Sequence, residues 1–91
     1  MQQQNDKNLQ FKKATGKVFK KIREENVRNS INKFALEYDI DRGNLSKIER
    51  GIINCSLITA WKIAEASGVK FSYFAKLLEE ELGENFKLIE E

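Results

Sequence analysis

Apolar residues recur at the spacing of an α-helix in five stretches of this chain, with short polar breaks between them. The stretches cover residues 14–25, 31–38, 42–50, 57–67 and 71–82. Val18 and Ile22, for example, lie four positions apart and mark one face of the first. No stretch alternates strictly between apolar and polar residues, as half-buried strands do. The pattern therefore predicts an all-α fold of five helices.

The second and third stretches lie almost directly after one another. Phe34, Ala35 and Tyr38 share a face of the first, Leu45 and Ile48 share a face of the second, and only residues 39–41 separate them. A small alanine suits the crossing of two helices that are joined by so short a turn. This arrangement predicts a helix-turn-helix unit, whose second helix fits the major groove of DNA.

The ends of these two helices carry residues typical of helix caps. Ser30 and Asp41 each stand directly before a helical run, where a short side-chain oxygen can accept from free backbone N–H groups. Gly51 follows the second run, where a left-handed residue ends many helices. The sequence thus defines both boundaries of the second helix.

This second helix and its exit, NLSKIERG at residues 44–51, resemble lambda-repressor-like helix-turn-helix domains of the XRE (xenobiotic-response-element) type. Further blocks at 54–57, 61–66 and 68–69 continue the resemblance, which extends over about 17–78. It implies a compact five-helix bundle that binds double-stranded DNA and regulates transcription. It also implies a homodimer on a two-fold symmetric site.

A helix of this type reads bases with its N-terminal residues. Those residues are Arg42, Gly43 and Asn44 here, and Lys47 lies one turn further along the same face. Arg42 and Lys47 suit the O6 and N7 acceptors of guanine, and Asn44 can bond a phosphate or an adenine. Gly43 offers no side chain, so its contact is lost or the backbone comes closer to the DNA.

At the start of the preceding helix, Ile31 occupies the position where many members of the family have a glutamine. We therefore expect Asn32 and Lys33 to contact phosphates. The first-turn N–H groups behind Ser30 also favour an anion.

The resemblance places Arg23 where a family arginine pairs with the glutamate of the IERG motif, here Glu49. Such a pair would neutralise a carboxylate on the helix that approaches DNA phosphates. The alternative is two independent surface charges, which would contribute little to stability.

The net charge of +2 conceals a gradient along the chain. Residues 1–28 hold eight basic and three acidic groups, and residues 71–91 hold two and six. The basic end suits a polyanion, although its lysines could equally form a solvated face. We expect a disordered polar arm over 1–11, the DNA-binding domain over 12–82, and a tail over 83–91.

The C-terminal third carries more apolar surface than one small domain needs. The helix at 71–82 has a wide apolar face, and Phe86, Leu88 and Ile89 follow it. These residues pack either on their own chain or on a second subunit, and we expect the second. We interpret Trp61 as a filler of the core or of the dimer edge rather than as a platform for bases.

The composition gives no support to catalysis. The chain has no histidine, one cysteine and no glycine-rich phosphate loop. We therefore expect no enzyme activity, metal, cofactor or small-molecule ligand, and, without a long apolar run, no membrane segment and a cytoplasmic location. The alternative function is a protein–protein interaction module, antitoxin-like or antirepressor-like, that keeps the fold without specific DNA binding.

Overall fold

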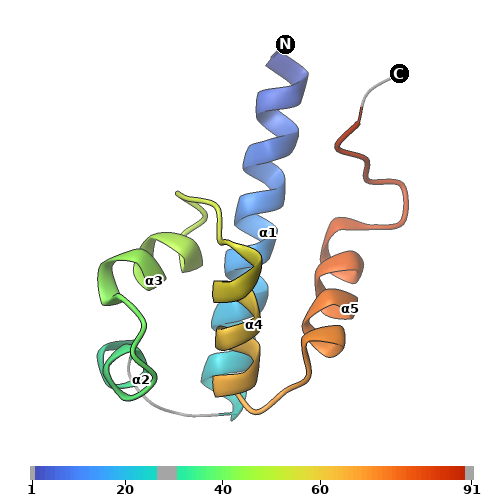
Figure 1. Cartoon of the computed structure of the whole chain (residues 1–91). Helices are drawn as coiled ribbons and strands as arrows, with labels where there is room; N and C mark the ends of the chain where they lie inside the picture. The colour runs from blue at the N-terminus through green and yellow to red at the C-terminus, as the bar shows by residue number, and fades with distance from the viewer. Residues whose placement is uncertain (1, 27–30, 90–91) are drawn as a thin grey trace.

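The computed structural model describes residues 2–26 and 31–89, with side chains from residue 7 onward. In these ranges it consists of helices and their connections, as predicted (Figure 1). The helices are α1 (Gln2–Asn26), α2 (Ile31–Glu37), α3 (Arg42–Glu49), α4 (Leu57–Ala66) and α5 (Phe71–Leu82). The all-α fold is confirmed, and four of the five helices lie within a residue of their predicted bounds.

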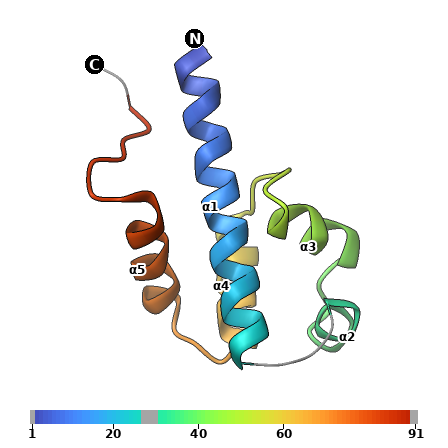
Figure 2. The same ribbon diagram turned by 180° about the vertical axis from the view of Figure 1, so that it is seen from behind.

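The long helix α1 is the central element of the bundle. Figures 1 and 2 show α5 on one side of it and α2 and α3 on the other, with α4 crossing one face. It contacts α3, α4 and α5, and the ring of Phe19 stacks on that of Phe74 with centroids 4.1 Å apart. Both rings are buried. The two ends of the described chain therefore share one core.

The N-terminal part of α1 differs from the expectation. The helix begins at Gln2, so a disordered arm over 1–11 is wrong for residues 2–11, while Met1 lies outside the described residues. No proline or glycine precedes Gly16 to interrupt a helix. The ring of Phe11 also finds a partner in Phe86 of the tail, with centroids 6.2 Å apart. That long-range contact is invisible to local periodicity.

The buried core joins all five helices. Its members are Val18, Phe19, Ile22, Phe34, Ala35, Leu45, Ile48, Ala60, Ile63, Ala64 and Phe74. The inward residues predicted for α3 are confirmed. Leu57, in the first turn of α4, is apolar yet 70% exposed. Tyr38 lies just past the end of α2 at the edge of the core, with its ring 5.2 Å from that of Phe34, with which it was predicted to share a face.

Gly16 allows α1 and α3 to approach each other at backbone distance. A β-carbon at this position would overlap the carbonyl oxygen of Ile48 and lie 2.6 Å from that of Glu49. Both oxygens belong to the last turn of α3, so this contact fixes the end of the helix that carries the predicted base-reading residues. The sequence prediction did not include this contact.

The tail packs in part on its own chain. Phe86 is half-buried beside Phe11, whereas Leu88 and Ile89 are exposed. Lys17 and Glu81 add a surface ion pair of 3.0 Å between α1 and α5. The tail was expected to pack either on its own chain or on a second subunit. Phe86 packs on its own chain.

Candidate nucleic-acid interface

The turn between α2 and α3 reverses the chain in very few residues. The N–H of Ile40 donates to the carbonyl of Ala35 at 2.9 Å, and that of Tyr38 to the carbonyl of Phe34 at 3.2 Å. Asp39 takes a left-handed conformation with φ of 56°, which aspartate tolerates better than most residues. Ala35 is buried at the crossing of the two helices, as its small size predicts.

Both ends of α3 are capped as the sequence predicts. The Oδ1 atom of Asp41 accepts from the N–H of Asn44 at 2.8 Å. At the other end Gly51 has φ of 75°, and the N–H of Ile52 donates to the carbonyl of Lys47 at 2.8 Å. Such bonds satisfy the free backbone groups of the last turn. The short helix α3 is therefore held in one defined position.

The side chains of α3 divide into two faces. Leu45 and Ile48 are buried in the core, while the predicted base-reading residues Arg42, Gly43, Asn44 and Lys47 are exposed. All four predicted base-reading residues are therefore accessible on the surface of α3.

The predicted phosphate-binding residues lie on the neighbouring helix α2. Asn32 and Lys33 are exposed in its first turn. Ser30, predicted as the cap of this helix and as a phosphate site, lies outside the described residues.

A hydrogen bond joins the two helices at this surface. Nη1 of Arg42 donates to Oδ1 of Asn32 at 2.9 Å, and both residues are exposed. The bond holds the guanidinium of the first residue of α3 next to the first turn of α2. The sequence pattern gave no sign of this contact, because the two residues belong to different helices.

Glu49 pairs with Arg23 on the side of α3 that faces α1. Nε of Arg23 donates to Oε2 of Glu49 at 2.7 Å, and Nη2 donates to Oε1 at 3.0 Å. The two side chains are only 7% and 5% exposed. The hydrogen bond to Glu49 raises the pKa of Arg23 above its ordinary value. The predicted ion pair is confirmed over the alternative of two independent surface charges.

The described residues offer little basis for a metal site, a reactive thiol or a membrane-spanning helix. They contain no group of three or more His, Cys, Asp or Glu residues that could hold a metal ion. Burial raises the pKa of the Cys55 thiol to about 11, which keeps it protonated at neutral pH. No described helix combines the length and the apolar character that crossing a membrane requires.

Comparison with known proteins places this geometry in a family. The family model described as helix-turn-helix matches residues 19–74, from the middle of α1 to α5. The control protein C.MunI of Mycoplasma sp. is 35% identical over 77 residues, which cover 85% of this chain and 99% of that relative. The chain therefore belongs to the helix-turn-helix family, with the lambda-repressor-like fold of the XRE type, and is a DNA-binding regulator of transcription.

Proposed function

We propose that α3 enters the major groove and reads base edges with Arg42, Asn44 and Lys47. The observation that carries this proposal is the exposure of these side chains on a helix whose two ends are capped and whose opposite face is buried. Arginine and lysine suit guanine, and asparagine suits adenine. Gly43 lets the backbone approach the bases at the same level.

Phosphate contacts come from the start of α2 in this proposal. Asn32 and Lys33 lie in its first turn, and the site includes Ser30 directly before it. Phosphate contacts position a protein on the duplex, and base contacts give the specificity. The pairing of Glu49 with Arg23 supports the same orientation, because it neutralises a carboxylate on the helix that carries the base-reading residues.

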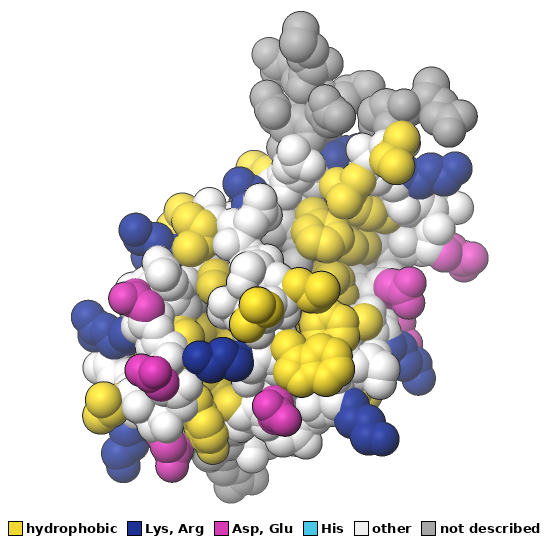
Figure 3. Space-filling model, in the orientation of Figure 1, with side chains coloured by type: hydrophobic (Ala, Val, Ile, Leu, Met, Phe, Trp, Pro, Cys, Tyr) yellow, Lys and Arg dark blue, Asp and Glu magenta, His cyan; other side chains and the backbone are white. Residues whose placement is uncertain are grey.

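The regulator acts as a homodimer in this proposal, because one such domain covers one half-site. Three apolar side chains on one side of α4 are largely exposed: Leu57 by 70%, Ile58 by 78% and Trp61 by 56%. Trp61 stacks on Phe71 of α5 at 5.4 Å. Figure 3 shows hydrophobic side chains gathered over α4 and α5. A surface of this kind is typical of a protein contact.

This α4–α5 surface, formed by Leu57, Ile58, Trp61 and Phe71, is the dimer contact that we propose. It differs from the sequence expectation, which placed the contact on the wide apolar face of the helix at 71–82 and on Phe86, Leu88 and Ile89. Phe86 packs instead on Phe11 of its own chain. The acidic residues of α5 would repel phosphate, which keeps this end of the molecule away from the duplex.

Selection of bound sequences from a random DNA pool tests the base reading. We expect enrichment of a two-fold symmetric sequence, and loss of that enrichment in the double variant Arg42→Ala, Lys47→Ala. Binding should also weaken steeply with salt, because phosphate contacts release counterions. If no sequence were enriched, the interaction-module alternative would be favoured instead.

Sedimentation tests the dimer separately. Trp61→Ala and Ile58→Ala should shift the chain towards the monomer, whereas Leu36→Ala should not. Leu36 is a matched control because it is an apolar residue of α2 that is 85% exposed. A wild-type chain that stays monomeric at high concentration, both alone and on DNA, would refute the dimer.

A further inference from the structure

Two parts of the chain lie outside the family match at residues 19–74, and they pack against each other. The first half of α1 contacts the end of α5 and the tail through the rings of Phe11 and Phe86. The ion pair of Lys17 with Glu81 joins the same parts. These segments form a platform beside the DNA-reading unit. The family match does not include this platform.

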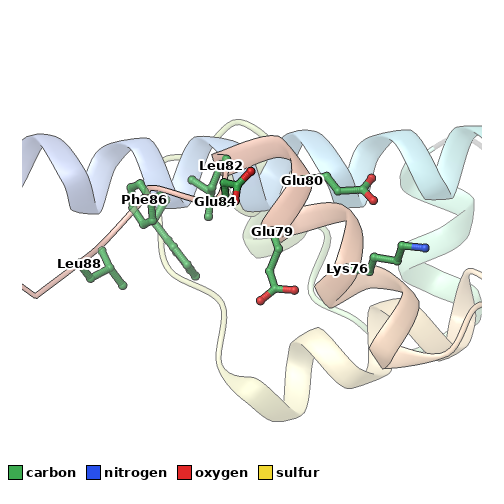
Figure 4. A pocket seen from close by; sticks show the side chains of 9 residues that line it. Lys76, Glu79, Glu80, Leu82, Glu84, Phe86 and Leu88 are labelled. Carbon is green, nitrogen blue, oxygen red and sulfur yellow. The ribbon is translucent and has the colours of Figure 1, made fainter.

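A groove of about 870 Å³ opens in this platform (Figure 4). Apolar side chains from three segments line it: Phe11 of α1, Leu82 of α5, and Phe86 and Leu88 of the tail. Leu88 is 39% exposed and the other three are half-buried. The groove therefore offers apolar surface that the chain itself does not cover.

The rest of the lining is charged. Lys76, Glu79, Glu80 and Glu84 all contribute to the groove, which gives three carboxylates against one ammonium group. Among the described residues, none of the four forms an ion pair or a side-chain hydrogen bond. Figure 4 shows Lys76, Glu79 and Glu80 along α5, with Phe86 and Leu82 near α1. The groove thus has an apolar floor, formed by Phe11, Leu82, Phe86 and Leu88. Its acidic margin is formed by Glu79, Glu80 and Glu84.

The charge of the groove determines which kinds of molecule can bind there. DNA is repelled by the three carboxylates. A second copy that docked the same groove face to face would bring the carboxylates of both copies together against only two ammonium groups, which is also repulsive. A partner with lysine or arginine beside apolar residues complements both the floor and the margin.

We infer that this groove binds a basic amphipathic helix of another protein. The partner's apolar side chains cover Phe86 and Leu88, and its cations pair with Glu79, Glu80 and Glu84. The flanking α1 and α5 have their backbone groups bonded within the helices, so they cannot pair with an extended strand. A helix satisfies its own backbone groups and needs only a complementary surface.

A designed peptide tests this inference on the full-length chain. The probe is a synthetic helical peptide of leucine and lysine with one apolar face, and its counterpart has glutamate in place of lysine. Amide chemical shifts of the isotope-labelled protein locate the binding site. We expect shifts concentrated at Phe11 and residues 76–88 with the lysine peptide, and none with the glutamate peptide.

Charge-removing variants supply the matched control. The triple variant Glu79→Gln, Glu80→Gln, Glu84→Gln should weaken lysine-peptide binding about tenfold, since each exposed ion pair contributes modestly. The triple variant Glu24→Gln, Glu25→Gln, Glu65→Gln changes the net charge equally at exposed positions outside the groove lining and should bind as the wild type does. Leu88→Ala should weaken binding without removing a charge.

Three outcomes would overturn the inference: no binding of the lysine peptide, equal weakening in both triple variants, or shifts located elsewhere. DNA affinity of the groove variant is measured in parallel and should be unchanged or slightly higher. A negative result for peptide binding would therefore not contradict the base-reading proposal. A negative result for base reading would likewise not contradict the inference about the groove.

Discussion

Arg42 of α3 and Asn32 of α2 are joined by a hydrogen bond of 2.9 Å on the surface that we propose faces DNA. The bond limits the rotamers of the guanidinium before DNA arrives, so Arg42 loses less conformational freedom on binding. Asn32 thus has a positioning role in addition to any phosphate contact.

Arg42→Ala should weaken binding to the selected DNA by about 1–3 kcal/mol and relax the preference at one base position. Asn32→Ala should weaken it less and leave the preferred base unchanged. Fluorescence anisotropy on the selected sequence and its single-base variants measures both effects. Lys87→Ala, which removes a cation from the tail, is the control. If Arg42→Ala weakened all sequences equally, Arg42 would contact only phosphate.

Removal of the carboxylate that pairs with Arg23 should destabilise the fold. Glu49→Ala breaks a buried ion pair in which Glu49 accepts from both Nε and Nη2 of Arg23, and a loss of this kind typically costs about 3–5 kcal/mol. Glu49→Gln keeps one acceptor and should cost less. Urea unfolding of both variants, with Glu81→Ala as a control that breaks only the exposed pair with Lys17, gives the comparison. Unchanged stability with stronger DNA binding in Glu49→Ala would make Glu49 an ordinary surface charge.

Substitution by alanine of the two serines that flank α4 should change the stability of the fold in opposite directions. Ser67 is 1% exposed and its hydroxyl has no hydrogen-bond partner among the described residues, so Ser67→Ala should raise stability by about 1 kcal/mol. The hydroxyl of Ser56 accepts from the N–H of Thr59 at 3.1 Å and caps the helix, so Ser56→Ala should lower it by about 1 kcal/mol. Thermal unfolding measures both, and a loss of stability in Ser67→Ala would reveal a partner for its hydroxyl.

The thiol of Cys55 should react slowly in the folded protein. Burial raises its pKa from 9.0 to about 11, so the folded thiolate fraction at pH 8 is roughly a hundredfold below that of the unfolded chain. Alkylation at pH 8 with and without urea measures the difference. Because the folded pKa is raised, the stabilisation from the neutral thiol is complete below pH 9 and declines as pH rises towards 11. Equal alkylation rates would show that the thiol is not shielded.

Gly16→Ala should destabilise the fold although alanine favours helices. The new methyl group would meet backbone oxygens of α3, which cannot rotate away as a side chain can. Overpacking of this kind costs about 1–3 kcal/mol, against about 1 kcal/mol gained from helix propensity. Gly43→Ala is the comparison for urea unfolding, because its β-carbon would lie 3.2 Å from the side-chain oxygen Oδ1 of Asp41, which can shift, and not against a backbone. A stabilised Gly16→Ala variant would mean that α1 and α3 can separate without cost.

The sequence predicted those features that depend on neighbours along the chain. The helix periods, the cap at Asp41 and the left-handed Gly51 all follow from local chemistry, and the motif around Glu49 led to the partner on α1. Contacts between distant segments were not predictable in this way. The first half of α1 has no apolar period, and the ring of Phe11 packs on that of Phe86 in the tail. Leu57 is apolar yet exposed, because the first turn of α4 extends past the core.

The predicted base-reading residues came from a sequence motif, whereas the contacts that hold them in place were not predicted. Gly16 in an otherwise helical pattern was a signal of close backbone approach that the prediction did not use. The bond between Asn32 and Arg42 depends on the angle at which α2 and α3 cross, which no pattern of residue types specifies.

The stacking of Phe19 on Phe74 has a consequence for synthesis of the protein. The helix α1 leaves the ribosome before α3, α4 and α5, which pack on it, and its stacking partner Phe74 lies in the last of these three helices. A nascent chain that has not yet released α5 therefore leaves the ring of Phe19 on α1 without its stacking partner, and its core is incomplete. Prematurely terminated products would not compete with the finished regulator for its DNA sites.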